Sequence, residues 1–150
     1  MAPTTEISGP NVKISWTPPS ANGSPITGFR IQIKQYNTDS FFIDSTNCDG
    51  ASATITANAY CLVPINILRG TPFNHPWGAS IYAKIVAFNV YGYSDESSVG
   101  NGAIILTAPD APLNVAEVVS MRAATSITFN WIAGPANGGA PVIDYAIISD

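Results

Sequence analysis

Charged residues are scarce in this 150-residue sequence and make up only 11% of it. Six basic residues stand against ten acidic ones, and the basic residues form no cluster. Because nucleic-acid binding depends on a basic patch or stripe, we expect no nucleic acid as a partner. The low charge accompanies 46% hydrophobic residues. This balance excludes a disordered chain, since disorder requires low hydrophobicity and high net charge.

Long hydrophobic runs are absent as well. No apolar run approaches the roughly 18 residues that a membrane-spanning helix needs, so we expect no membrane span in this fragment. The first residues, MAPTTEISG, lack the basic region and apolar core of a secretory signal. If the protein is secreted, its signal is expected to lie outside this fragment or to have been removed.

Residues suited to catalysis or metal binding are few. The sequence has one histidine, His75, which we expect on a surface loop. It contains no nucleophile-elbow pattern, no paired carboxylates and no Cys and His spacing typical of a zinc site. The sequence therefore predicts that this chain is not an enzyme and has no catalytic residue or resident cofactor.

The two cysteines, Cys48 and Cys61, flank a polar stretch that contains glycine and alanine. An even number of cysteines at short separation predicts a disulfide, and hence an oxidising compartment. Closing a loop of about 14 residues would stabilise the fold by roughly 3 kcal/mol. The alternative is two free, buried thiols in a cytosolic domain.

Glycine and proline, by contrast, are frequent, with 12 of each between short apolar runs, which is typical of an all-β chain. Residues 11–17 and 28–36 alternate apolar and polar side chains and predict strands with one buried face. A shorter strand is expected at 40–46, and residues 101–112 are expected to close the domain with a strand and then a Pro-rich exit. The strongest strand is predicted at 80–92, with both faces largely apolar. The expected core residues are Trp16, Phe29, Ile31, Tyr82, Val86 and Phe88.

An internal repeat links the two ends of the sequence. WTPPSANGSPITGFRI begins at Trp16, and WIAGPANGGAPVIDYAI begins at Trp131, 115 positions later. With one inserted residue, Phe29 aligns with Tyr145 and Ile31 with Ile147. A period of this length indicates a tandem array of whole domains. Trp131 is accordingly expected in the core of a second domain.

These motifs together resemble the fibronectin type III domain, an antiparallel sandwich of two sheets and seven strands. VKISW is similar to the second strand of the family, and YAKIVAFNVYGYSDES to the sixth, with Tyr82 at the position of the tyrosine corner. TAPDAPLNV resembles the Pro-rich junction between consecutive modules. The style of the repeat is similar to large fibronectin-type arrays of protists such as ciliates.

The resemblance implies an all-β, immunoglobulin-like sandwich followed by the first strands of a second one. It places a domain with an enlarged cysteine-flanked insertion at residues 1–108, a Pro-rich linker at 109–113, and three strands of an incomplete domain at 114–150. The incomplete domain has two explanations. The chain is a window from a longer array, or another copy supplies the missing strands.

Several loop residues are candidates for contacts with other molecules. Phe73 and Trp77 offer an aromatic platform for a sugar or a neighbouring module, unless they pack over the sheet edge. Asn22 begins the tripeptide Asn-Gly-Ser, an N-glycosylation pattern on a turn, although Pro25 follows it directly. Asp95, Glu96 and Asp110 are candidates for calcium at the domain junction, but solvated loop charges are the plainer interpretation.

From these observations we expect a structural module of an extracellular or cell-surface repeat protein that forms a rod or filament. Its expected partners are neighbouring copies or repeats of the same protein. Two alternatives stay open. One is an adhesion or recognition module that binds a protein or glycan through its loops. The other is an accessory module of a secreted glycan-active enzyme.

Overall fold

The computed structural model describes residues 2–148. It divides into two compact units, Met1–Ile105 and Leu106–Asp150, which we call unit 1 and unit 2. The division falls three residues before the expected end of the first domain at residue 108. In the described part of the chain, no helix is long and apolar enough to cross a membrane.

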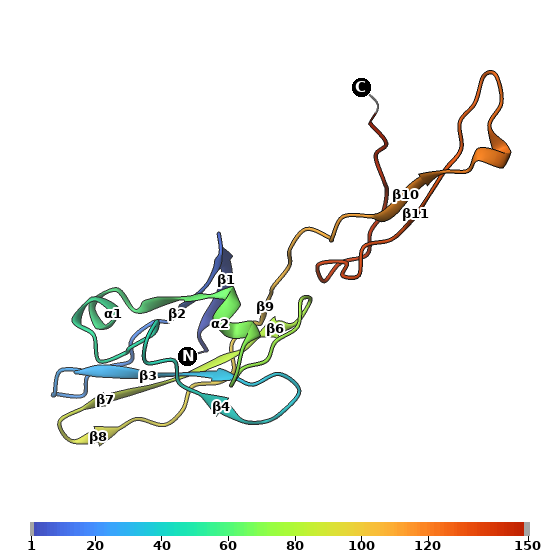
Figure 1. Cartoon of the computed structure of the whole chain (residues 1–150). Helices are drawn as coiled ribbons and strands as arrows, with labels where there is room; N and C mark the ends of the chain where they lie inside the picture. The colour runs from blue at the N-terminus through green and yellow to red at the C-terminus, as the bar shows by residue number, and fades with distance from the viewer. Residues whose placement is uncertain (1, 149–150) are drawn as a thin grey trace. The chain divides into compact units, whose positions relative to one another are not determined.

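Unit 1 is an antiparallel β-sandwich, which confirms the fold class expected from the sequence (Figure 1). One sheet has the order β1-β2-β5, the other has the order β4-β3-β7-β8, and a short pair β6-β9 lies beside them. All the strand pairs are antiparallel. The strands are β1 (Thr4–Ser8), β2 (Asn11–Ser15), β3 (Gly28–Lys34), β4 (Phe41–Phe42), β5 (Tyr60–Pro64), β6 (Ser80–Ile81), β7 (Ala83–Asn89), β8 (Gly92–Tyr93) and β9 (Ala103–Ile104).

The core lies between the two sheets, where period-two side chains from both inner faces meet. The Trp16 and Phe29 rings join the sheets in an edge contact, with centroids 5.1 Å apart. Burying one such side chain contributes about 1.5–3 kcal/mol relative to leaving it exposed. The inward positions on the main strands are Val12, Ile14, Trp16, Phe29, Ile31, Ile33, Cys61, Val63, Ala83, Ile85 and Ala87.

The face of β7 that enters the core is the opposite of the one expected. Tyr82 and Phe88 are only partly buried and lie on the outer face of the sheet together with Val86, which is 5% exposed but does not belong to the cluster between the sheets. The core instead receives Ala83, Ile85 and Ala87. Because successive strand residues point to opposite faces, both sets cannot enter the same core. The pairing of Phe29 with Ala87 places a small residue beside the large aromatic ring.

Two short helices interrupt the expected all-β chain. Helix α1 (Ala53–Asn58) lies inside the cysteine-flanked insertion, and helix α2 (Ile65–Arg69) follows β5. Helix α2 buries Ile65 and Leu68 against the core and ends before Gly70. Neither helix exceeds six residues, so the 3.6-residue period is too brief to be recognised in the sequence.

Serine side chains replace part of the strand pairing beyond β8. The backbone N–H groups of Ile85 and Ala87 donate to the hydroxyls of Ser97 and Ser94, each at 3.0 Å. In the opposite direction, the backbone N–H of Ser97 donates to the carbonyl of Ile85, and the backbone N–H of Ser94 donates to the carbonyl of Ala87. These bonds satisfy the outer edge of β7 without a regular strand.

Unit 2 is a hairpin followed by a chain without regular structure. Strands β10 (Leu113–Glu117) and β11 (Phe129–Ile132) pair antiparallel, with a 3-10 helix η1 (Val119–Met121) between them. The third strand expected after them does not form at 141–148; residues 149–150 lie outside the described residues. In unit 1 the equivalent strand β3 is bonded along its length to β7, and the described part of unit 2 holds no counterpart of β7.

Candidate functional site

Unit 2 presents an apolar groove to solvent. The groove has a volume of about 500 Å³. Aromatic and aliphatic side chains from β10, β11 and the segment after β11 line it. The rings of Trp131 and Tyr145, both in its wall, pack against each other at a tilt, with centroids 5.3 Å apart. We define the apolar groove by Val115, Phe129, Trp131, Tyr145 and Ile147.

The repeat shows how unusual this exposure is. Phe29 and Ile31, the unit 1 equivalents of Tyr145 and Ile147, are 3% and 1% exposed. Tyr145 is 38% exposed and Ile147 is 65% exposed. In unit 1 these positions are covered because the sheet β1-β2-β5 packs against the sheet that contains β3, and side chains of both sheets form one core. Trp131, expected in a core, is likewise only partly buried, since no described strand of unit 2 takes the place of β5 or β7.

Asp110 shapes the start of unit 2. Its carboxylate accepts a hydrogen bond from the N–H of Ala136 at 3.1 Å, and its own N–H donates to the carbonyl of Ala136 at 2.9 Å. These bonds fix the Pro-rich segment against the turn that follows β11. The carboxylate is therefore already used by the protein backbone.

The other calcium candidates lie on the surface of unit 1. Glu96 accepts a hydrogen bond from Lys84 at 3.0 Å, and this bond and the charge of the ammonium hold the pKa of the Glu96 carboxyl below its usual range. Asp95, beside it, is exposed. Within residues 2–148, no three His, Cys, Asp or Glu side chains lie close enough together to hold a metal ion.

The two residues of the expected aromatic platform are placed differently, since Phe73 is buried and Trp77 is only partly buried. Phe73 is 1% exposed and belongs to the hydrophobic core, so it cannot contact a ligand. Trp77 packs partly against that core, and the Arg69 guanidinium covers its ring at 4.3 Å from the centroid. This face of the Trp77 ring therefore already makes a cation–π contact within the protein.

His75 is buried, contrary to the surface position expected from the sequence. Its side chain is 3% exposed, and its Nε2–H donates to the carbonyl of Lys34 at 2.8 Å. The Nδ1 atom has no hydrogen-bond partner among the described residues. Burial lowers the pKa of His75, and the bond to Lys34 opposes this only partly. Protonation of Nδ1 would place an unpaired N–H inside the protein.

We therefore expect acid to destabilise unit 1 through His75. Since the folded pKa lies below the unfolded value of about 6.5, the unfolded chain binds the proton first as pH falls. The contribution of neutral His75 to the free energy of unfolding is therefore complete above pH about 6.5 and is lost as the pH falls toward the folded pKa. Urea unfolding between about pH 7 and pH 5 should show this loss in the native sequence.

The matched variant is His75→Gln, whose amide can keep the bond to Lys34 without titrating. Its free energy of unfolding should stay level over the same pH range, because the chain has no other histidine. If the free energy of unfolding falls equally with pH in both proteins, the pH dependence does not come from His75.

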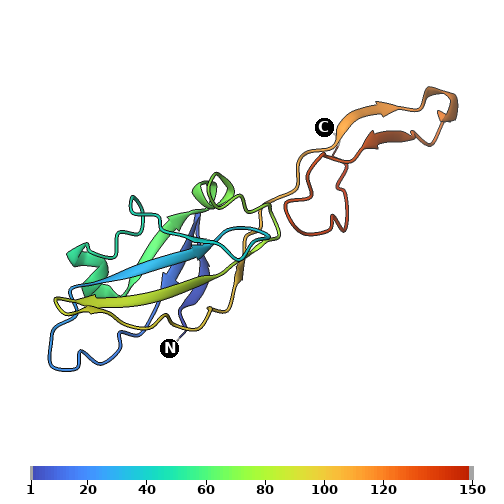
Figure 2. The same cartoon turned by 90° about the horizontal axis from the view of Figure 1, so that it is seen from below.

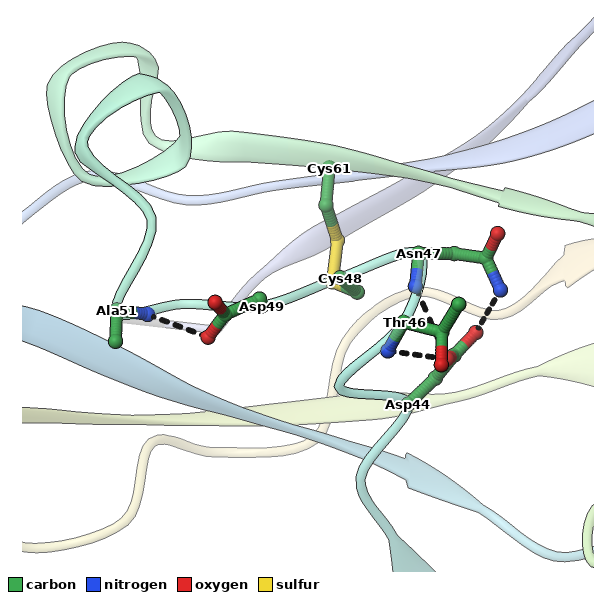
Figure 3. The surroundings of a disulfide bond; sticks show 7 residues. All are labelled: Asp44, Thr46, Asn47, Cys48, Asp49, Ala51 and Cys61. Carbon is green, nitrogen blue, oxygen red and sulfur yellow. Dashed lines mark hydrogen bonds between the residues drawn. A yellow bond between two sulfur atoms is a disulfide. The ribbon is translucent and has the colours of Figure 1, made fainter.

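Cys48 and Cys61 form a disulfide, with Cα atoms 5.2 Å apart (Figure 3). Cys61 lies on β5, while the segment after Cys48 joins the other sheet, where the N–H of Phe29 donates to the carbonyl of Gly50 at 2.9 Å. The disulfide thus ties the two sheets together at one edge. The Asp44 carboxylate fixes the segment before Cys48 by accepting hydrogen bonds from the backbone N–H groups of Thr46 and Asn47.

Asn22 occupies an exposed turn. Its φ of 50° lies in the left-handed region, which asparagine tolerates better than most residues. The N–H of Ser24 donates to the carbonyl of Ala21 at 3.1 Å and closes the turn. The side chain is accessible to a modifying enzyme, as the glycosylation pattern requires.

One exposed feature was missed in the sequence. Val90, Tyr91 and Tyr93, at the β7–β8 hairpin, are 79%, 87% and 63% exposed. The apolar pattern predicts a continuous strand over 80–92 and therefore gives no indication of a turn at Val90. The signal that could have revealed the turn is the Tyr-Gly pair, since Gly92 has a φ of 144°.

Comparison with known proteins adds little beyond the fold. No family model matches the sequence, and no curated protein matches it. Among solved structures, domains A168–A170 of titin share 19% identity at a TM-score of 0.47, over 69% of this chain and 31% of theirs. The FN1–FN3 domains of chicken CNTN1 share 17% identity at a TM-score of 0.45, over 87% and 42%.

The chain thus spans less than half the length of either structure. Identities and TM-scores this low indicate nothing about what the chain binds. The strand order of its two sheets describes the fold directly: unit 1 is a fibronectin type III-like β-sandwich.

Proposed function

We propose that this chain is a structural module of an extracellular or cell-surface repeat protein, and that it builds a rod or filament by tandem or head-to-tail stacking of domains. The apolar groove of unit 2 carries the proposal. Soluble proteins rarely leave a contiguous apolar surface uncovered, and such surfaces mark sites of assembly. Here the exposed residues occupy positions that are buried in unit 1.

The repeat also indicates the chemistry of the partner. In unit 1 the equivalent side chains are covered by the opposite sheet, whose strand β5 directs Cys61 and Val63 into the core, while β7 extends the sheet beside β3. A neighbouring copy or repeat of the same protein offers strands of this kind. Such strands would also bond the backbone of residues 141–148, which form no ladder in unit 2.

The disulfide supports an extracellular or cell-surface location. Disulfides persist in oxidising compartments and are rare in reducing ones. Cys48 and Cys61 are 0% and 2% exposed, so solvent does not reach the bond. A stapled sandwich is also suited to a load-bearing role, because the bond holds its two sheets together.

A recognition module is the second candidate, and the β7–β8 hairpin is the observation that favours it. Tyr91 and Tyr93 are exposed there beside an accessible turn. Tyrosine provides a large, rigid contact area at low entropic cost, which is why it is common in binding loops.

Light scattering of the purified chain, with electron microscopy of native material, tests the structural proposal. We expect regular filaments whose repeat is close to one domain length. If a second copy covers the groove, the purified chain should also form multimers. If the covering strands belong to a tandem neighbour, the purified chain should be monomeric and bind a hydrophobic dye at the groove.

Ile147→Ser is the informative variant, because an exposed side chain contributes little to folding and its replacement should act only on assembly. It should reduce multimers or dye binding several-fold. Ile7→Ser is the matched control, since Ile7 lies on β1 in unit 1 and is 47% exposed. Discrete native particles together with a monomeric chain that binds no dye would refute the proposal.

A further inference from the structure

A second cavity lies at one end of unit 1. The turn between β2 and β3 runs beside the β7–β8 hairpin there, as Figure 2 shows in blue and yellow. The two loops and the end of β7 border an open pocket of about 300 Å³. We call this cavity the hairpin pocket, and its main side chains are Ser20, Asn22, Phe88, Asn89, Tyr91 and Tyr93.

Hydrogen bonds hold the two loops in fixed positions. Asn89 accepts the N–H of Tyr91 at 2.9 Å and donates from its side-chain amide to the carbonyl of Ser24 at 3.4 Å. The N–H of Thr27 donates to the carbonyl of Phe88 at 2.9 Å. The pocket is therefore formed before any ligand arrives, which reduces the entropic cost of binding.

The two tyrosines differ in how firmly they are placed. Tyr93 packs against Phe88, with ring centroids 5.5 Å apart, and the Arg30 guanidinium lies 4.6 Å from the centre of its ring. Tyr91 is 87% exposed and makes no aromatic or cation–π contact among the described residues. Its ring is left free to contact another molecule.

The lining of the hairpin pocket contains no acidic or basic side chain. Its uncommitted polar groups are the Asn22 side-chain amide and the hydroxyls of Tyr91 and Tyr93, for which the described part of the chain offers no hydrogen-bond partner. A charged ligand would lose its hydration there without gaining a charged partner. A ligand with an apolar C–H face and uncharged hydroxyls, in contrast, would match both the ring and the amide.

We propose that the hairpin pocket binds one ring of a neutral saccharide. The C–H face of the sugar stacks on Tyr91, because the electron-rich face of the ring attracts those hydrogens. The Asn22 amide donates to and accepts from the sugar hydroxyls. The site belongs to unit 1 and does not depend on the apolar groove of unit 2.

Titration of the full chain, produced without glycosylation, tests this site. The probes are cellotriose and triacetylchitotriose. Their binding is followed by the NMR chemical-shift changes of the backbone amides. Shifts confined to the two loops are expected with at least one of these sugars. Tyr91→Ala should weaken the binding by about tenfold or more, the loss that a central contact gives. Asn22→Gln should weaken it less.

The control is Tyr60→Ala, because Tyr60 is 38% exposed on β5, in the other sheet. It should bind the sugar as the native sequence does. A glycosylated chain that no longer binds free sugar, with binding restored by Asn22→Gln, would show that a glycan on Asn22 occupies the pocket and would overturn the proposal of a free ligand. The absence of shifts with both sugars at millimolar concentration would also overturn it, as would equal binding of a heparin fragment.

Discussion

Replacing both cysteines with alanine, Cys48→Ala with Cys61→Ala, is expected to lower the free energy of unfolding of unit 1 by about 3 kcal/mol. The disulfide closes a loop with a sequence separation of 13 residues and so restricts the unfolded chain. Both positions are at most 2% exposed, and alanine avoids burying the hydroxyl that serine would introduce. Urea unfolding followed by tryptophan fluorescence measures the change.

The measurement needs a Trp131→Phe background, so that only Trp16 and Trp77 report and both lie in unit 1. Reduction of the native sequence is the matched comparison and should give a similar loss, whereas reductant should leave the double alanine variant unchanged. If the native sequence unfolds at the same urea concentration with and without reductant, the disulfide does not stabilise the fold.

The sequence predicted the parts of the fold that depend on local alternation. β2 and β3 each have one apolar face, and Ile14 and Ile31 are buried as the pattern requires. A polar residue at every second position leaves only one possible orientation toward the core. The all-β class was predictable from such strands and the turns between them, and the antiparallel sandwich from the resemblance to the fibronectin type III domain.

Orientation was not predictable for β7. Its two faces are both largely apolar, so period two alone gave two equivalent answers. The choice depends on volume across the sheet, where Ala87 lies beside Phe29 and Ala83 beside Ile33. Such pairing is non-local and cannot be derived from the strand itself.

Contacts at a distance in the sequence also explain the errors at the candidate sites. Phe73 and His75 lie in a segment rich in turn residues, which predicted exposure, yet Phe73 enters the core and His75 bonds to Lys34. The exposed hairpin at Tyr91 was missed for the converse reason, because an apolar sequence predicted burial. The repeat at Trp131 was recognised, but the solvent exposure of the groove depends on which strands cover it.

The insertion between the cysteines offers a second test, at Gly50. Gly50→Ala is expected to lower the free energy of unfolding by about 3 kcal/mol, since overpacking a buried site costs about 1–3 kcal/mol and occasionally more. A Cβ on this buried glycine would overlap the carbonyl oxygen of Phe29 and the end of the Ile31 side chain. The overlap with backbone cannot be relieved by a rotamer change. Urea unfolding in the Trp131→Phe background measures the loss.

Gly70→Ala is the matched control. A Cβ there would meet only carbonyl oxygens at 3.6 Å, an ordinary contact, and the φ of −91° suits alanine. Its effect should stay within about 0.5 kcal/mol. The comparison separates the two roles of the insertion. If Gly50→Ala is as mild as Gly70→Ala, the segment can move away from β3, and the disulfide alone holds the sheets together at that edge. If Gly50→Ala lowers the free energy of unfolding as much as expected, the backbone contact between Gly50 and Phe29 holds the insertion to β3 independently of the disulfide.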